Sequence, residues 1–195
     1  MLKKIVLCSL LLGFALGLAA PSHADRRSYV WTYEYKTMPK GMMELEYYQT
    51  LEFPDTNNTK VSTWKQNVEL EYGLTDRWDV SIYQNFKQAN IASGGTFSYD
   101  GFKVRTRYRL GESGQFIADP LLYLELQEQN DLSKSSVLEG KIILAKDLGR
   151  INMSYNQIIK IGSSTENEYA AGLSFEFNPA FKLGFEGKGN YTSGK

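Results

Sequence analysis

The sequence predicts an all-β fold, an antiparallel up-and-down transmembrane β-barrel of which about ten strands are visible. Three observations support this prediction. Apolar and polar residues alternate with a period of two through most of the chain after Tyr29, the pattern of strands with two different faces. The alternating segments run about 9–12 residues, which is enough for a tilted strand to cross a bilayer. Short turns also alternate with longer polar links, as they do along outer-membrane barrels.

The length and composition indicate one folded domain. The chain has 195 residues, of which 23% are charged and 13% are aromatic, and this composition argues against a disordered protein. Its 22 basic and 22 acidic side chains balance. A balanced charge gives no electrostatic footprint for nucleic acid, so we expect no nucleic-acid partner.

Residues 1–24 have the features of a secretory signal peptide. Lys3 and Lys4 precede an uncharged apolar run at 5–18, and Ser22 and Ala24 offer small residues to a signal peptidase. The run is shorter than the ~20 residues that a membrane helix needs. We therefore divide the chain into a signal peptide at 1–24 and a barrel domain at 25–195, and we expect export.

Each expected strand follows from its alternation. Period-two segments occur at 29–36, 43–53, 64–72, 78–87, 102–110, 122–127, 168–177 and 182–186. We predict two more strands within 137–161, although Ile142-Ile143-Leu144 and Ile158-Ile159 break the alternation there. Residues 29–37 have two interpretations, a strand that closes the sheet or a lead-in on the periplasmic side.

The connections separate into two kinds. We expect short turns at 38–41, 74–77, 147–150 and 178–180, and longer polar links at 54–61, 88–100, 128–136 and 162–167. The connection at 111–119 is intermediate. If the short turns are periplasmic, the strand near 182–188 runs outward with no strand returning. We therefore expect either a fragment of a barrel with about twelve strands or a register that is wrong by one element, with residues 29–37 as its source.

Period two alone does not tell which face lies inside. A soluble sandwich or barrel points its apolar residues inward, whereas a membrane barrel points them toward lipid and keeps its polar residues in the lumen. Strand length, the short and long connections, and aromatic residues near strand ends favour the membrane arrangement. Those aromatic residues are Trp31, Phe53, Trp64, Tyr72, Trp78, Phe86, Phe102 and Phe177.

The sequence offers little for catalysis. Cys8 and His23 are the only cysteine and histidine, and both lie in the expected leader, so the mature chain has no histidine or thiolate for a nucleophile or a metal site. Neighbouring carboxylates on one strand face, about 7 Å apart, have the spacing for acid–base chemistry, but so many on a polar face are more typical of solvated or paired groups. We expect no enzyme, no cofactor and no metal.

The most concentrated feature is a row of four cations on one face of one expected strand. Lys103, Arg105, Arg107 and Arg109 form this row, and the candidate acidic partners on other strands are Glu44, Glu46, Glu69, Glu71, Asp79 and Glu125. One interpretation is a charged constriction that selects solutes by sign. The other, which we favour, is pairing of the charges across a narrow lumen.

The motif at residues 71–80 (EYGLTDRWDV) resembles the strand-turn-strand signature of a family of bacterial outer-membrane β-barrels. That family is described as transporter-like or as MetA-pathway of phenol degradation proteins. Pro39-Lys40-Gly41, residues 107–110 and Phe177-Asn178-Pro179 fit the same pattern. The resemblance implies a Gram-negative outer membrane with its lipid and lipopolysaccharide, the barrel-assembly machinery as a partner, and movement of small compounds. It supplies no catalytic or binding residues.

Three function hypotheses follow. The first is a narrow or gated passage for an unidentified small solute through a polar lumen, with the cation row setting charge preference. The second is a structural or surface-interaction barrel whose lumen is plugged by its own salt bridges. The third is a soluble periplasmic barrel that binds a hydrophobic ligand. Detergent dependence separates the third from the others, and conductance separates the first from the second.

Overall fold

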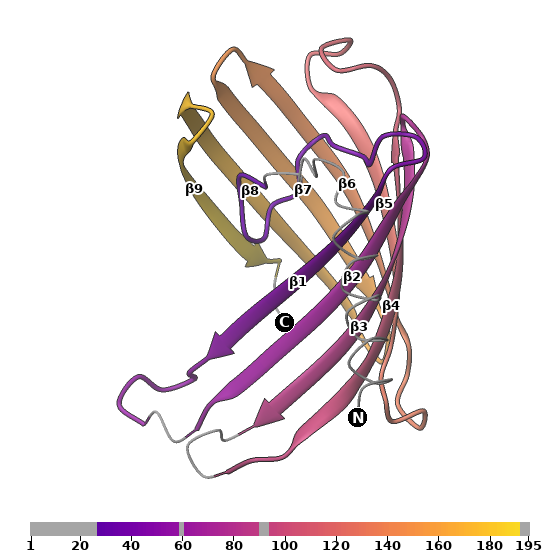
Figure 1. Cartoon of the computed structure of the whole chain (residues 1–195), viewed down its shortest axis with the longest axis vertical. Coiled ribbons are helices and arrows are strands. Elements are labelled where there is room, and N and C mark those ends of the chain that lie inside the picture. Colours follow the sequence, from indigo (N-terminus) through magenta and orange to yellow (C-terminus); the bar gives the residue numbers. More distant parts are fainter. Residues whose placement is uncertain (1–26, 59–60, 90–93, 192–195) are drawn as a thin grey trace, which may run out of the picture.

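The protein is represented by a computed structural model that describes residues 27–58, 61–89 and 94–191. The expected leader lies outside the described residues. The described part is one sheet of nine strands, shown in Figure 1. The strands are β1 (Met43–Glu52), β2 (Thr63–Thr75), β3 (Trp78–Ala89), β4 (Phe97–Arg109), β5 (Asp119–Glu128), β6 (Val137–Leu148), β7 (Ile151–Ile161), β8 (Thr165–Asn178) and β9 (Phe181–Asn190).

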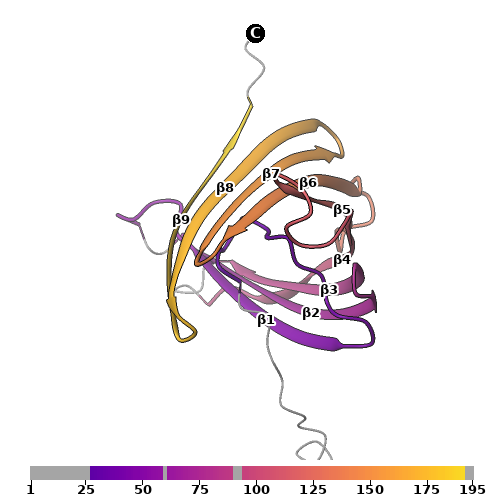
Figure 2. The same ribbon diagram turned by 90° about the horizontal axis from the view of Figure 1, so that it is seen from above.

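Every strand pairs antiparallel with its neighbours in sequence, so the sheet order is β1 to β9 without a crossover. This confirms the predicted antiparallel up-and-down architecture. The sheet is strongly curved, so that it has a concave and a convex face, as seen from above in Figure 2. In the described part of the chain, β1 and β9 are its two edges, and the curled sheet is a half-barrel.

The connections that were expected to be short and those expected to be long lie at opposite ends of the strands. The turns at 76–77, 149–150 and 179–180, together with the link at 110–118, lie at the upper end in Figure 1, here called the short-turn end. The strand ends joined by the other four links lie at the opposite end, here called the long-loop end; they are Glu52 and Thr63, Ala89 and Phe97, Glu128 and Val137, and Ile161 and Thr165. Two expected loops are shorter than predicted, because β4 already begins at Phe97 and β8 begins at Thr165.

The two faces of the sheet differ in polarity. On β4, Arg105 is 0% exposed and Arg107 is 5% exposed, whereas the adjacent Val104 is 44% exposed. On β5, Glu125 is buried and Leu124 is exposed. Charged and polar side chains therefore fill the concave interior, and apolar side chains cover the convex outside.

Residues 29–37 do not form a strand, which corrects that interpretation and leaves nine strands in the described part of the chain. They belong to an irregular stretch, here called the inner segment (residues 28–38), that crosses the concave side of the sheet (Figure 2). Tyr29, Thr32, Glu34, Tyr35 and Met38 are buried along it. The period of two in this part of the sequence does not carry over into burial, since Trp31 is exposed whereas Thr32 and Glu34 are buried.

A small apolar cluster lies beneath the inner segment. Tyr35 packs with Leu121 and Tyr123 of β5 and with Ile143 and Ala145 of β6. Ile143 is fully buried because it points into the interior, while its neighbours on either side point outward. The broken alternation at 142–144 therefore marks the place where an apolar side chain faces inward to receive the inner segment.

Candidate functional site

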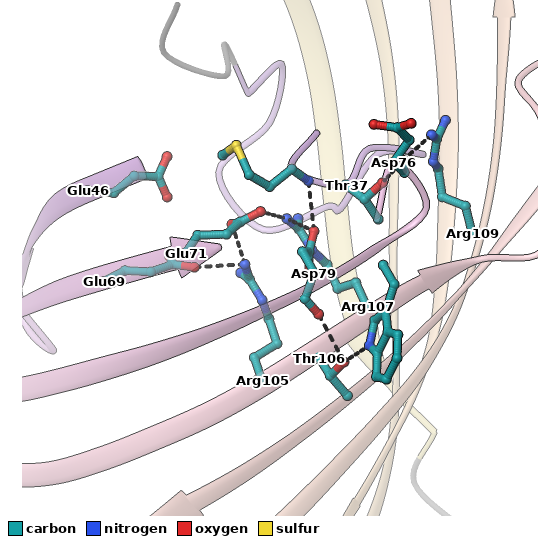
Figure 3. A network of polar contacts seen from close by, with 12 residues as sticks. Thr37, Glu46, Glu69, Glu71, Asp76, Asp79, Arg105, Thr106, Arg107 and Arg109 are labelled. Carbon is teal, nitrogen blue, oxygen red and sulfur yellow. Dashed lines mark hydrogen bonds and ion pairs between the residues drawn. The ribbon is translucent and has the colours of Figure 1, made fainter. Parts of the chain in front are cut away.

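A buried ionic network, drawn in Figure 3, lies in the concave interior in the half of the sheet nearer the short-turn end, here called the short-turn half. At its centre, Arg105 of β4 pairs with Glu69 of β2 at 2.8 Å and also donates to Glu71 of the same strand. The side chains of Arg105 and Glu69 are fully buried. The Arg105 guanidinium also donates a hydrogen bond to the hydroxyl of Tyr83 on β3. Strand β4 is therefore linked to both β2 and β3.

Arg107 continues the network toward the short-turn end. Its Nε donates to Asp79 Oδ1 at 3.0 Å and its Nη2 donates to Asp79 Oδ2 at 2.7 Å, the two-pronged geometry that a planar guanidinium favours. The same Nη2 pairs with Glu71. Glu71 therefore bridges the two arginines, which reduces the repulsion between them.

The two ends of the cation row have other partners. Lys103 pairs with Glu125 of β5 at 3.0 Å. Arg109 donates to the backbone carbonyl of Asp76 in the turn between β2 and β3. The row is thus divided among three sets of acceptors and does not present four free cations to the lumen.

The remaining predicted residues lie on β1, on the same concave face. Glu46 pairs with Arg27 at 3.3 Å, and Arg27 also lies 3.6 Å from Glu69. Glu44 lies opposite Glu71 in the β1–β2 register. The predicted charged residues therefore share the interior face, and the pairing interpretation describes their geometry. Burying such charges is tolerable because nearly every one has an opposite partner.

The inner segment is bound to β9 chiefly through the carboxylate of Glu186. Glu186 accepts hydrogen bonds from the backbone N–H groups of Val30, Trp31 and Thr32 at 2.7, 2.9 and 3.0 Å. Three consecutive N–H groups around one carboxylate form an anion-binding nest. This one side chain therefore satisfies the backbone donors of residues 30–32.

Asparagines of β7 hold the middle of the inner segment. The Asn156 side-chain amide accepts from the Tyr33 N–H at 2.6 Å and donates to the Tyr33 carbonyl at 2.9 Å. The Tyr29 hydroxyl donates to Asn152, and its ring occupies the space beside Gly172 of β8, where a Cβ atom would come within 2.5 Å of it. Asn156 thus satisfies the N–H and carbonyl groups of Tyr33, which have no strand partner.

Residues of the 71–80 motif hold the far end of the inner segment. The Met38 N–H donates to Asp79 Oδ2 at 3.0 Å, and the Lys40 N–H donates to Asp76 Oδ1 at 3.0 Å. A Cβ atom on Gly73 would lie 2.0 Å from the carbonyl oxygen of Pro39. These residue types therefore have a structural role in the motif. Its glycine makes room for the chain that enters β1, and its two aspartates accept hydrogen bonds from that chain.

Tyr33 places an aromatic ring among the interior cations. The Lys141 ammonium lies 4.3 Å from the Tyr33 ring centroid and 4.2 Å from that of Tyr123, within the range of cation–π attraction. The two rings meet edge to face at 5.0 Å. The inner segment is thereby packed against β5 and β6 as well as hydrogen-bonded to β7 and β9.

Sequence reasoning placed the charged row correctly but missed the residues that bind the inner segment, chiefly Asn156 and Glu186. A usable signal was present in the inward apolar residues Ile143 and Ile158, both buried, which break the strand alternation. Inward apolar side chains in a polar interior indicate that something covers them.

Two kinds of feature are absent from the described residues. Within residues 27–58, 61–89 and 94–191, no group of three or more His, Cys, Asp or Glu side chains is arranged to hold a metal ion. The same part of the chain contains no helix that is long and apolar enough to cross a membrane.

Comparison with known proteins adds no relative. No protein-family model matches the chain, and neither the curated proteins nor the solved structures give a match. The resemblance carried by residues 71–80 therefore stays a prediction.

Proposed function

We propose that this chain is an outer-membrane β-barrel protein that gates the passage of small solutes, and that the inner segment is its closing element. The observation that carries the proposal is the inner segment itself, a non-strand stretch that crosses a polar interior and is held there by side chains.

The distribution of polarity supports the membrane location. Apolar side chains on the convex face, among them Leu45, Ile82, Val104, Leu124, Ile142 and Leu173, are exposed. A soluble barrel that binds a hydrophobic ligand needs the opposite arrangement, so this polarity weighs against the third hypothesis. In lipid, an unpaired strand edge is costly. The proposal therefore requires β1 and β9 to be paired in the membrane, with one another or with further strands.

The way in which the inner segment is held supports gating. Its backbone N–H groups donate hydrogen bonds to side-chain oxygens of Glu186, Asn156 and Asp79, each worth about 0.5–3 kcal/mol. Because no ladder of backbone hydrogen bonds fixes the inner segment to a strand, it can leave the interior without breaking the sheet.

A structural barrel is the second candidate, favoured by a different observation. Arg105, Glu69 and Asp79 are 0% exposed, and they remain in the interior after the inner segment is removed. If this ionic network alone closes the lumen, displacing the inner segment opens nothing.

Conductance in planar bilayers separates the two candidates. The chain without its leader would be compared with a variant lacking residues 28–37 and with the variant Asn156→Ser/Glu186→Gln, which keeps the chain length. A shift in gel migration on heating would confirm that each is a folded barrel. We expect low, intermittent conductance from the unaltered chain and larger, steadier conductance from both variants.

Other outcomes contradict the gating proposal. If all three folded proteins are silent at every voltage, the structural barrel replaces the gated passage. If all three conduct equally, the inner segment does not close the lumen. Lys87→Gln is a suitable control, because its partner Asp100 lies away from the inner segment, and it should conduct like the unaltered chain.

A further inference from the structure

A separate cavity lies on the concave side toward the long-loop end. Its volume is about 280 Å³, and its lining comes from β4 to β8. The polar side chains that define it are Lys103, Glu125, Gln127, Glu139, Lys160 and Glu166. The inner segment contributes nothing to this lining, so the cavity is distinct from the space that the inner segment fills.

Positive and negative groups are interleaved around this cavity. Lys103 pairs with Glu125 at 3.0 Å, and Lys160 pairs with Glu168 at 2.8 Å and lies 3.7 Å from Glu139. Glu139 also pairs with Lys141 at 2.7 Å, so the positive and negative charges behind the lining still leave one carboxylate in surplus. The side chains of Lys103 and Lys160 are 28% and 31% exposed. An ammonium group has three N–H donors, so each lysine keeps at least one donor for a ligand while it remains paired. The carboxylates likewise have acceptor positions beyond those their lysines use.

The net charge of the side chains that line the cavity restricts which ligands it can bind. Two lysines face three glutamates, so a ligand with two negative charges would meet a net repulsion. A ligand that has both a carboxylate and an ammonium group finds a partner for each. An additional cationic group on the ligand offsets the surplus carboxylate.

We propose that this cavity is a binding subsite for small zwitterions of the α-amino-acid type, and that it prefers basic members of the class over acidic ones. Small-molecule sites typically occupy about 300–1,000 Å³. The cavity volume of about 280 Å³ lies just below that range, which suits a ligand as small as a single amino acid. The ligand carboxylate lies near Lys103 and Lys160, and its ammonium group lies near the glutamates.

This inference deepens the proposed function, since the cavity lies on the path that a solute takes from the long-loop end. Binding itself does not require passage. A chain that binds zwitterions without conducting would overturn the proposed function only, and a chain that conducts without binding them would overturn this inference only.

Isothermal titration of the folded, detergent-solubilised chain tests the proposal. The probes are L-arginine, L-glutamate, acetate and methylammonium. We expect L-arginine to bind at millimolar or lower concentration, with L-glutamate roughly tenfold weaker and the single-charge probes weaker still. Lys160→Gln and Glu166→Gln should each weaken L-arginine roughly tenfold, because each removes one partner of the zwitterion.

Lys87→Gln is the matched control, since it removes a lysine whose ion pair with Asp100 lies outside the cavity, and its affinity should be unchanged. A shift in gel migration on heating would confirm that every variant is folded. No binding of L-arginine, equal affinities for the cavity variants and the control, or binding of acetate as tight as that of L-arginine would each overturn the proposal.

Discussion

Arg105 and Glu69 form an ion pair at 2.8 Å although a whole strand, β3, lies between the strands that carry them. Both side chains are fully buried. The curl of the sheet makes this possible, because it brings the inward side chains of β2 and β4 together above β3 (Figure 3). The interior of the short-turn half is therefore filled by charges that neutralise one another.

Removing Asp79 should destabilise the barrel strongly. Asp79→Ala leaves Arg107 with one carboxylate and deprives the Met38 N–H of its acceptor. Breaking a buried pair on one side costs about 3–5 kcal/mol, which a denaturant titration of the detergent-solubilised barrel measures. Asp100→Ala, which breaks the exposed pair with Lys87, should cost less than about 1 kcal/mol. Similar losses in the two variants would contradict a buried network.

Tyr35→Phe should weaken the contact between the inner segment and the link before β5. The Tyr35 hydroxyl donates to the Gly111 carbonyl at 2.7 Å and accepts from the Gly111 N–H at 3.1 Å. Leaving these buried groups unpaired costs about 1–3 kcal/mol. Tyr47→Phe removes an exposed hydroxyl that bonds Gln66, so its unfolding free energy should hardly change. An equal effect in both would argue against a docked inner segment.

Gly73→Ala should disturb the entry into β1. A Cβ atom there would lie 2.0 Å from the Pro39 carbonyl oxygen, whereas one on Gly187 of β9 would meet nothing within 4 Å. We expect Gly73→Ala to displace the 38–41 turn and to increase protease cleavage of the inner segment. Gly187→Ala should behave like the unaltered chain. Unchanged cleavage of Gly73→Ala would show that the chain does not pass this glycine as described.

The Tyr33 hydroxyl should ionise near neutral pH. Burial raises its pKa, but the cations Lys141, Arg105 and Arg27 outweigh burial and the nearby Glu125, and they lower the pKa from 10.0 to about 7. A group whose pKa is lowered on folding stabilises the folded state at high pH. This contribution is complete above the unfolded pKa of 10.0 and is lost as pH falls through about 7.

The near-ultraviolet absorbance of tyrosinate measures this ionisation. The folded chain should show one tyrosine that titrates close to neutrality, and Tyr33→Phe should abolish that step. Thermal stability should rise from neutral to alkaline pH in the unaltered chain more than in Tyr33→Phe. If the step persists in Tyr33→Phe, another tyrosine is responsible and the arrangement of cations around Tyr33 is wrong.

The strands were predictable because a two-faced sheet imposes a period of two on the sequence, and the segments at 64–72 and 78–87 follow it closely. The inner segment was not, because Tyr29 to Tyr35 shows the same period without any strand partner. Burial in this stretch does not follow that period, since Trp31 is exposed while Thr32 and Glu34 are buried. A period of two in the sequence shows only that residue types alternate. It does not report whether the backbone groups are paired in a ladder or, as for Tyr33, by a side chain such as Asn156.

The face of the charged row was also predictable, but its partners were not. Four cations two residues apart must share one face of a strand. Which carboxylate each one meets depends on the register and on the curl of the sheet. For this reason Arg105 reaches Glu69 two strands away while Lys103 meets Glu125 on the adjacent strand.

The central claim is that the convex face of the sheet meets lipid and the concave face does not. A spin-label scan along β5 in lipid vesicles tests it most directly, because the chain after residue 24 contains no cysteine and single cysteines can be introduced one at a time. Labels at Leu122, Leu124 and Leu126 should be accessible to oxygen dissolved in the bilayer, and labels at Tyr123 and Glu125 should be shielded from it. The reverse pattern, or no alternation along β5, would contradict the claim.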